Sequence, residues 1–169
     1  MKIKYCLFFL LFLSNCGYTT FLGEIKNIYV KPVINSIKIT KEERAYKEYN
    51  LYPLFLDKLL TNRLVEEINL RGAYSTKVSD AYLLKCEIYD FKAEGLRYSD
   101  SDEVSEQRLK LYVKVKLFSP QSKLLKKRVI VGQTTYFLSG PYRISQEDAY
   151  RNLVKDTAQR IVEFILSDW

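Results

Sequence analysis

The chain has 169 residues, with 27 lysines and arginines against 20 aspartates and glutamates, which gives a formal net charge of +7. A hydrophobic share of 47% and a charged share of 28% are ordinary for a globular protein, so disorder throughout is excluded. The sequence contains no histidine, which excludes Ser-His-Asp and Cys-His catalysis and histidine-containing zinc sites. It therefore favours a binding or structural protein over an enzyme.

The first fifteen residues are typical of a signal peptide. Lys2 and Lys4 precede an uninterrupted apolar run of eight residues, Cys6–Leu13. This run is too short to cross a bilayer of about 30 Å as a helix. It has the length of the apolar segment of a signal peptide, and we therefore predict that residues 1–15 are removed on export.

The apolar run ends in Leu13-Ser14-Asn15-Cys16-Gly17, which resembles the lipobox of bacterial lipoproteins. In that motif the peptidase cleaves before the cysteine, and acyl chains such as palmitate are attached. Asn15 departs from the family pattern, which prefers a small residue there. The alternatives are an ordinary secretory signal with a chance cysteine and a buried core segment. The extreme N-terminal position favours lipidation of Cys16, and Gly17 after it resembles lipoproteins sent to the outer membrane.

Removal of residues 1–15 changes the composition of what remains. The loss of Lys2 and Lys4 lowers the net charge from +7 to +5. Because Cys16 would carry lipid, Cys86 is the remaining free thiol, and no internal disulfide can form in the exported chain. Its stability must therefore come from its hydrophobic core.

The first strand is predicted directly after a lipidated N-terminus and tether at residues 16–24. Ile25–Val33 alternates, with Ile28 and Val30 on one face, as in a half-buried strand. The charged segment that follows, residues 35–50, predicts an extended loop or an irregular start of a helix.

Two longer segments have helical periodicity. Leu54–Arg71 places apolar residues mainly at i+4 spacing, and Gly72 lies where a C′ glycine belongs. Its predicted inner positions are Leu56, Leu59, Leu60, Leu64 and Ile68. Ser145–Leu166 begins with an N-cap serine, Ser145, and keeps an apolar row along one side. We interpret both apolar stripes as core packing.

Three more strands are predicted between the helices, over Ala81–Phe91, Arg108–Phe118 and Lys123–Leu138. The first of them places Cys86 on the inner face, as a small buried hydrophobe rather than a reactive thiol. The second alternates most regularly, and its outer positions are Lys110, Tyr112, Lys114 and Lys116. The short turn between the last two strands predicts an antiparallel hairpin.

The order β-α-β-β-β-α indicates the fold class. It predicts one α+β domain over residues 25–169, with a mostly antiparallel four-stranded sheet and two helices on one face, a two-layer sandwich.

Motifs that carry chemistry are scarce. The six glycines are scattered and form no phosphate-binding loop. The acidic run at residues 100–103 lacks the spacing of a calcium loop, and a solvated loop is the better interpretation. No catalytic residue, cofactor or metal site is predicted.

The basic residues are more informative. Lysines on the outer face of the Arg108–Phe118 strand lie beside Lys126 and Lys127 near the hairpin turn, and Arg143 follows the last strand. Such a surface suits a polyanion, and at an outer membrane the available polyanion is lipopolysaccharide. The alternative is that these lysines only keep an open sheet face soluble.

Short motifs spread over the exported chain resemble the LptE family of lipopolysaccharide-assembly lipoproteins. They are Cys16-Gly17-Tyr18, Ile28-Tyr29-Val30-Lys31-Pro32, Gly72-Ala73-Tyr74, Ser79-Asp80-Ala81, Glu106-Gln107-Arg108-Leu109 and Glu147-Asp148-Ala149. The order Asp80-Ala81 reverses the one commoner in the family.

The resemblance implies a binding function without catalysis. LptE-type proteins lie in the lumen of the outer-membrane barrel LptD, help it assemble and receive lipopolysaccharide. Carried over, Lys126, Lys127 and Arg143 would contact lipopolysaccharide phosphates, with the protein lipid-anchored at the outer membrane. One alternative is a periplasmic lipoprotein regulator of peptidoglycan synthesis, which needs a long tether, whereas the first strand begins about nine residues after Cys16. Another is an enzyme that uses carboxylates alone.

Overall fold

The computed structural model describes residues 25–37, 55–99 and 102–167. Cys16, the predicted signal peptide and most of the predicted loop at residues 35–50 lie outside these ranges. The elements are β1 (Ile28–Val30), β2 (Ile34–Asn35), α3 (Leu56–Leu70), β3 (Tyr82–Tyr98), β4 (Val104–Phe118), β5 (Leu124–Phe137) and α4 (Gln146–Leu166).

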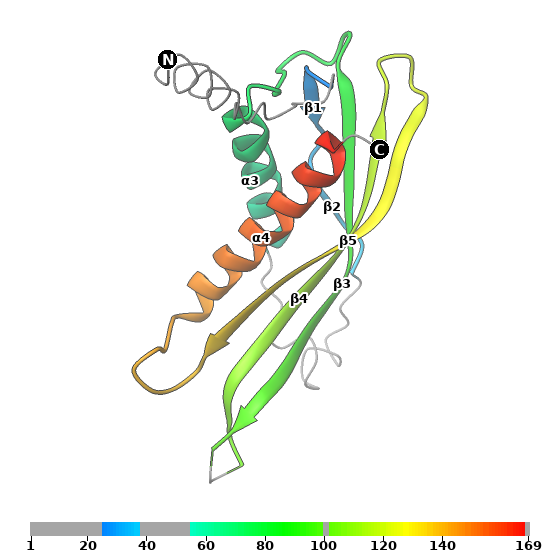
Figure 1. The fold of residues 1–169 in the computed structure, drawn as a ribbon. Helices are drawn as coiled ribbons and strands as arrows, with labels where there is room; N and C mark the ends of the chain where they lie inside the picture. Colours follow the sequence, from blue (N-terminus) through cyan, green and yellow to red (C-terminus); the bar gives the residue numbers. More distant parts are fainter. Residues whose placement is uncertain (1–24, 38–54, 100–101, 168–169) are drawn as a thin grey trace, which may run out of the picture.

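All the strands belong to one sheet, in the order β1-β3-β4-β5, with β2 also paired to β3. The long strands β3, β4 and β5 form an antiparallel meander, whereas β1 and β2 run parallel to β3. Both helices lie on the same side of the sheet (Figure 1). The predicted two-layer α+β class is therefore confirmed.

The sheet has five strands rather than the predicted four, because the segment Ile25–Val33 does not form one continuous strand. The N–H of Lys31 still donates to Leu84 of β3, at 3.0 Å. Pro32 has no N–H to continue the ladder. The N–H of Val33 turns instead to the Thr61 hydroxyl of α3, at 2.9 Å. Pairing resumes only at Ile34, as β2.

Helix α3 forms where it was predicted and ends at its glycine. Gly72 has φ +66°, a conformation that glycine adopts without strain. The N–H of Gly72 donates to the Asn69 carbonyl at 2.9 Å, and that of Ala73 donates to the Ile68 carbonyl at 3.1 Å, which is a Schellman motif. The prediction for Leu59 was wrong. Its side chain is 39% exposed, because Leu56, Leu60, Leu64 and Ile68 suffice to fill the stripe that α3 buries.

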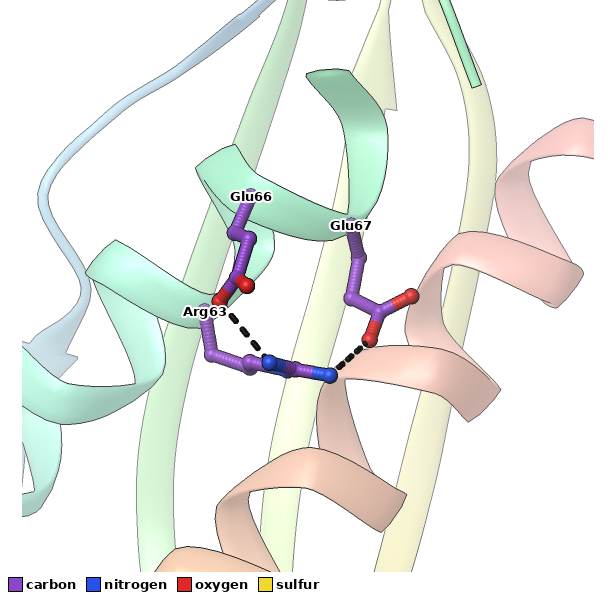
Figure 2. A network of polar contacts seen from close by, with 3 residues as sticks. All are labelled: Arg63, Glu66 and Glu67. Atoms are coloured by element: carbon purple, nitrogen blue, oxygen red, sulfur yellow. Dashed lines mark hydrogen bonds and ion pairs between the residues drawn. The ribbon is translucent and has the colours of Figure 1, made fainter. Parts of the chain in front are cut away.

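Helix α3 carries a cluster of charged side chains where it lies beside α4. Arg63 donates to Glu66 at 2.8 Å and to Glu67 at 2.6 Å, with the guanidinium and Glu67 directed toward α4 (Figure 2). The Glu67 side chain is only 8% exposed, so its charge requires a partner. Arg63 supplies that partner within the same helix.

Helix α4 begins at Ser145 as predicted, since the N–H of Asp148 donates to the Ser145 hydroxyl at 3.0 Å. Its predicted inner row is buried over the sheet, at Ala149, Leu153, Thr157, Ile161 and Ile165. The helix crosses β5 at Gly132, where an added Cβ would lie 2.8 Å from the Thr157 Cα. Glycine at this position therefore sets how closely α4 packs on the sheet.

The apolar inner faces of the strands and of both helices form one hydrophobic cluster. Cys86 lies within it, as predicted, and burial raises the pKa of its thiol to about 12. Among the described residues, no helix has the length and apolar character needed to cross a membrane.

Candidate functional site

The face of the sheet opposite the helices, which we call the open face, carries most of the charged side chains of β3, β4 and β5. No other element of the described ranges packs on it (Figure 1). On β4 the alternation is regular: Leu109, Leu111 and Val113 are fully buried under the helices. The intervening residues Lys110, Tyr112, Lys114 and Lys116 therefore lie on the open face, as predicted.

Over most of the open face, positive and negative charges neutralise each other across the strands. Lys110 lies 2.9 Å from Glu94, and Lys114 lies 3.6 Å from Glu87. A hydrogen bond from Lys110 lowers the pKa of Glu94. The pKa of Glu87 is lowered by a hydrogen bond from Ser36 and by the charge of Lys114. This part of the face is a network of ion pairs with little net charge.

Nearer the β4–β5 turn, three lysines lie side by side across the sheet. Lys85 of β3 is paired in register with Lys116 of β4, and Lys116 is paired with Lys127 of β5. We call Lys85, Lys116 and Lys127 the lysine row. Side chains directly opposite each other on one face have Cβ atoms about 4.5–5.5 Å apart, and like charges there repel. In the part of the chain that the structure describes, none of the three has a carboxylate within ion-pair distance.

Aromatic and aliphatic groups border the lysine row. The Lys85 Nζ lies 4.6 Å from the centre of the Phe118 ring, and Val129, beside Lys127, is 47% exposed. Uncompensated ammonium groups next to apolar surface can bind an anion that carries hydrocarbon, because the charges attract the anion and the apolar side chains contact the rest of the ligand.

The three residues that the sequence analysis expected to contact lipopolysaccharide phosphates lie apart in the structure. Lys126 and Lys127 are adjacent in β5, so they point to opposite faces. Lys127 lies on the open face, whereas Lys126 points toward α4 and donates to the carbonyls of Phe164, Ile165 and Ser167. Lys126 therefore caps the C-terminus of α4, which is favourable for a cation.

Arg143 lies at the other end of β5, in the loop that bridges back to Phe137. Ten residues separate Lys127 from Phe137, which corresponds to about 33 Å along a strand. Arg143 instead lines a groove with the buried pair Tyr136 and Gln107, whose side chains are hydrogen-bonded at 2.7 Å. It cannot bind the same small group as Lys127.

Sequence reasoning missed that Lys85 and Lys116 join Lys127. Lys116 was placed on the outer face by alternation, which was correct, and the same alternation in Ala81–Phe91 places Lys85 opposite the inner Cys86. Lys116 and Lys127 lie 31 and 42 positions after Lys85 in the sequence. The strand register brings the three lysines into one row, and the sequence could not provide that register. The only available signal was a lysine at an outward position of each of the three strands.

In three grooves formed by the described residues, carboxylates do not converge. A groove between β5 and α4 contains Glu163, one between the helices contains Glu66, and the groove at Arg143 contains no carboxylate. No group of acidic and cysteine side chains suited to a metal ion is present within the described ranges. Of the predicted acidic run, residues 100 and 101 lie outside those ranges.

The sequence was compared with known protein families. It matches the LptE family, described as lipopolysaccharide-assembly, over residues 26–167. The chain belongs to the LptE family. The resemblance seen in the short motifs is thereby confirmed, and the protein is a lipopolysaccharide-assembly lipoprotein by family. No curated protein matches the sequence.

Solved structures show the same LptE-like fold. Rare lipoprotein B from Shewanella oneidensis is 17% identical with a TM-score of 0.51, covering 82% of this chain and 93% of its own. A minor lipoprotein from Acinetobacter baumannii is also 17% identical with a TM-score of 0.51, covering 83% and 92%. The hypothetical protein CT253 from Chlamydia trachomatis is 14% identical with a TM-score of 0.54, covering 83% and 95%.

The order Asp80-Ala81, which departs from the commoner LptE pattern, fits this fold. Ala81 is buried directly before β3, and its N–H donates to the Val78 carbonyl at 3.4 Å. Asp80 is exposed in the preceding turn with φ +62°, a conformation that aspartate tolerates better than most residues. With the order Asp80-Ala81, the small residue Ala81 is buried and the polar residue Asp80 is exposed.

Proposed function

We propose that this LptE-family protein is an outer-membrane lipoprotein that assembles with and plugs the barrel LptD and helps deliver lipopolysaccharide to the cell surface. In this proposal residues 1–15 are a cleaved signal peptide, Cys16 carries the lipid, residues 16–24 are a tether, and residues 25–169 form one non-enzymatic domain. The family match supports the general role. The observation that carries the proposal is the lysine row.

The lysine row suits lipopolysaccharide because of its charge and its neighbours. Phosphates on lipid A and the core sugars would receive charge-assisted hydrogen bonds from Lys85, Lys116 and Lys127. Phe118 and Val129 offer apolar contacts beside them. Of the residues first predicted for this role, Lys127 is kept, Lys126 is assigned to the end of α4, and Arg143 stays a separate predicted contact at the far end of β5.

The distance from the proposed anchor to the sheet favours a partner in the same membrane. Twelve positions separate Cys16 from Ile28, the first residue of β1. A fully extended chain of that length spans about 40 Å. This keeps the domain close to the membrane that holds the lipid, which argues against the alternative role in touching a synthase of peptidoglycan at the inner membrane.

The barrel partnership is tested by purification of the full-length protein from detergent-solubilised outer membranes. We expect a large β-barrel protein to co-purify in a fixed ratio, and a Cys16→Ala variant should lose the lipid. Recovery of the lipidated protein alone, under conditions that preserve other barrel complexes, contradicts the assembly role.

Lipopolysaccharide binding is tested separately, with a Lys85→Gln, Lys116→Gln, Lys127→Gln triple variant. We expect binding to weaken by roughly 1 kcal/mol per lysine, with a smaller salt dependence than the original protein shows. The matched control replaces Lys26, Lys77 and Lys155, three exposed lysines away from the row, by glutamine. Equal loss in both triple variants would indicate a net-charge effect and contradict the assignment to the lysine row.

A further inference from the structure

Strand β5 is the last strand of the sheet, so only one of its two edges is paired, with β4. The other edge is covered at two places. The N–H of Gln133 donates to the Asp156 carboxylate of α4 at 2.8 Å. Phe137 forms a bridge with Arg143 in the loop that follows the strand. Both coverings lie in the second half of β5.

In the first half of β5 the backbone of the same edge is left open. Hydrogen-bonded pairs alternate along an antiparallel ladder, so Val131 and Val129 point their N–H and C=O groups to the same side as Gln133. Within residues 25–37, 55–99 and 102–167, no strand pairs with this side of β5. With Lys127, the open edge spans four residue steps, which is about 13 Å.

A groove of about 400 Å³ runs along this open edge, between β5 and the C-terminal half of α4. Its lining includes Arg128, Val129, Val131, Arg160, Glu163 and Phe164. One wall therefore presents backbone donors and acceptors, and the other presents an aromatic ring and charged side chains from the helix. This combination suits an extended peptide, because the peptide backbone can pair with the edge of β5 while its side chains contact the helix.

The charge of the groove determines which peptide fits. Arg128 and Arg160 line the groove with Glu163, and Arg160 contacts the carboxylate of Asp156 at 2.8 Å. Lys127, next to Arg128 on β5, adds a third cation at the edge, so the cations outnumber the two carboxylates. A second copy of this chain would bring the same basic edge against itself, and cationic side chains on an edge strand are a known means of preventing such pairing. An acidic segment is attracted by the same charges.

We propose that the open edge of β5 binds an extended, acidic segment of a partner protein, which adds to the sheet as a further strand. The N–H and C=O groups of Val129 and Val131 pair with the backbone of the segment. Its carboxylates lie on the side of the open face, beside Lys127, and its apolar side chains lie on the other side, toward Phe164. Lys127 belongs to both the lysine row and this edge, but the backbone pairing does not depend on lipopolysaccharide binding, because it uses the N–H and C=O groups at the edge of β5.

The probe is a fluorescein-labelled heptapeptide of alternating valine and glutamate, added to the full-length protein in detergent, with anisotropy as the readout. Val129→Pro and Val131→Pro each remove one edge N–H that the β4 ladder does not use, and proline is tolerated at such edge positions. We expect each to weaken binding at least tenfold. Thr135→Pro is the matched control, since its N–H lies on the same edge outside the groove, and it should leave binding unchanged.

Two peptide variants keep the test valid if a proline variant fails to fold. Methylation of the valine nitrogens removes the donors on one edge of the peptide, and methylation of the glutamate nitrogens removes those on the other. Strand addition requires that one set abolishes binding to the original protein while the other does not. Equal effects of both sets, equal binding of a valine–lysine peptide, or concentration-dependent dimers that exclude the peptide would each overturn the proposal.

Discussion

The two faces of the β3–β4–β5 meander are built from alternating residues of the same segments, yet they are stabilised differently. Under the helices, residues such as Leu111 and Val115 are fully buried, and Gly132 lets α4 approach the backbone. On the open face, ion pairs such as Lys110–Glu94 lie beside the lysine row, whose members form no ion pair within the described ranges. The covered face accounts for the stability of the fold. On the open face, repulsion within the lysine row lowers stability, but the same positive charges are available to a ligand.

The strongest test of this comparison is on the covered face, at Gly132. We expect Gly132→Ala to lower the free energy of unfolding by about 3 kcal/mol, because the added Cβ would meet the backbone of Thr157 at 2.8 Å. Urea denaturation measures this value. The neighbouring substitution Gln133→Ala, on the open face, should stay within about 0.5 kcal/mol. Equal effects at both positions would contradict the difference between the faces.

The adjacent residues Lys126 and Lys127 give the next test. Lys126→Met keeps the apolar stem but removes the hydrogen bonds to the end of α4, so we expect a loss of about 1 kcal/mol in the free energy of unfolding. Lys127→Met should leave stability unchanged and reduce lipopolysaccharide binding. Both properties are measured on both variants, and a stability loss confined to Lys127→Met would reverse our assignment.

Because the lysines of the row repel each other, we predict that one substitution there raises the free energy of unfolding. Lys116 is the central member, so Lys116→Gln should raise the free energy of unfolding by about 0.5 kcal/mol at low ionic strength. The gain should disappear in 1 M salt, where the screening length is about 3 Å. Lys110→Gln, which breaks the ion pair with Glu94, should have the opposite effect. A loss of stability in Lys116→Gln would show that the row is neutralised in solution.

The smallest expected effect is on the pH dependence of stability. The pKa of Glu87 in the folded protein lies below its ordinary value of 4.5, because of the Ser36 hydroxyl and Lys114. Its contribution is therefore present above pH 4.5 and is lost as the pH falls through the lowered pKa. We expect the urea midpoint of Glu87→Gln to change less between pH 5 and pH 3 than that of the original protein. Parallel curves would show that Glu87 is not stabilised in the fold.

The sequence predicted those features that depend on local pattern. Both helices, the Gly72 terminus, the Ser145 cap and the alternation of β4 follow from periodicity and capping chemistry. The break at Pro32 could have been predicted from the sequence, because proline has no N–H to donate to a strand ladder. The hydrogen bond from the Val33 N–H to the Thr61 hydroxyl could not, because Thr61 belongs to another element. The lysine row and the role of Lys126 depend on strand register and on where α4 ends, and neither is encoded by neighbouring residues.

The pairing of β1 has a consequence for the order in which the protein can fold. Ile28 forms a single bridge with Tyr74 and pairs with Tyr82, 54 positions later, so the first strand joins the sheet only after β3 has been synthesised. Closing such a long loop is slow compared with forming a local hairpin such as β4–β5. If Cys16 is lipidated at the start of export, attachment to the membrane comes first. The sheet then closes on a chain whose N-terminus is already held at the bilayer surface.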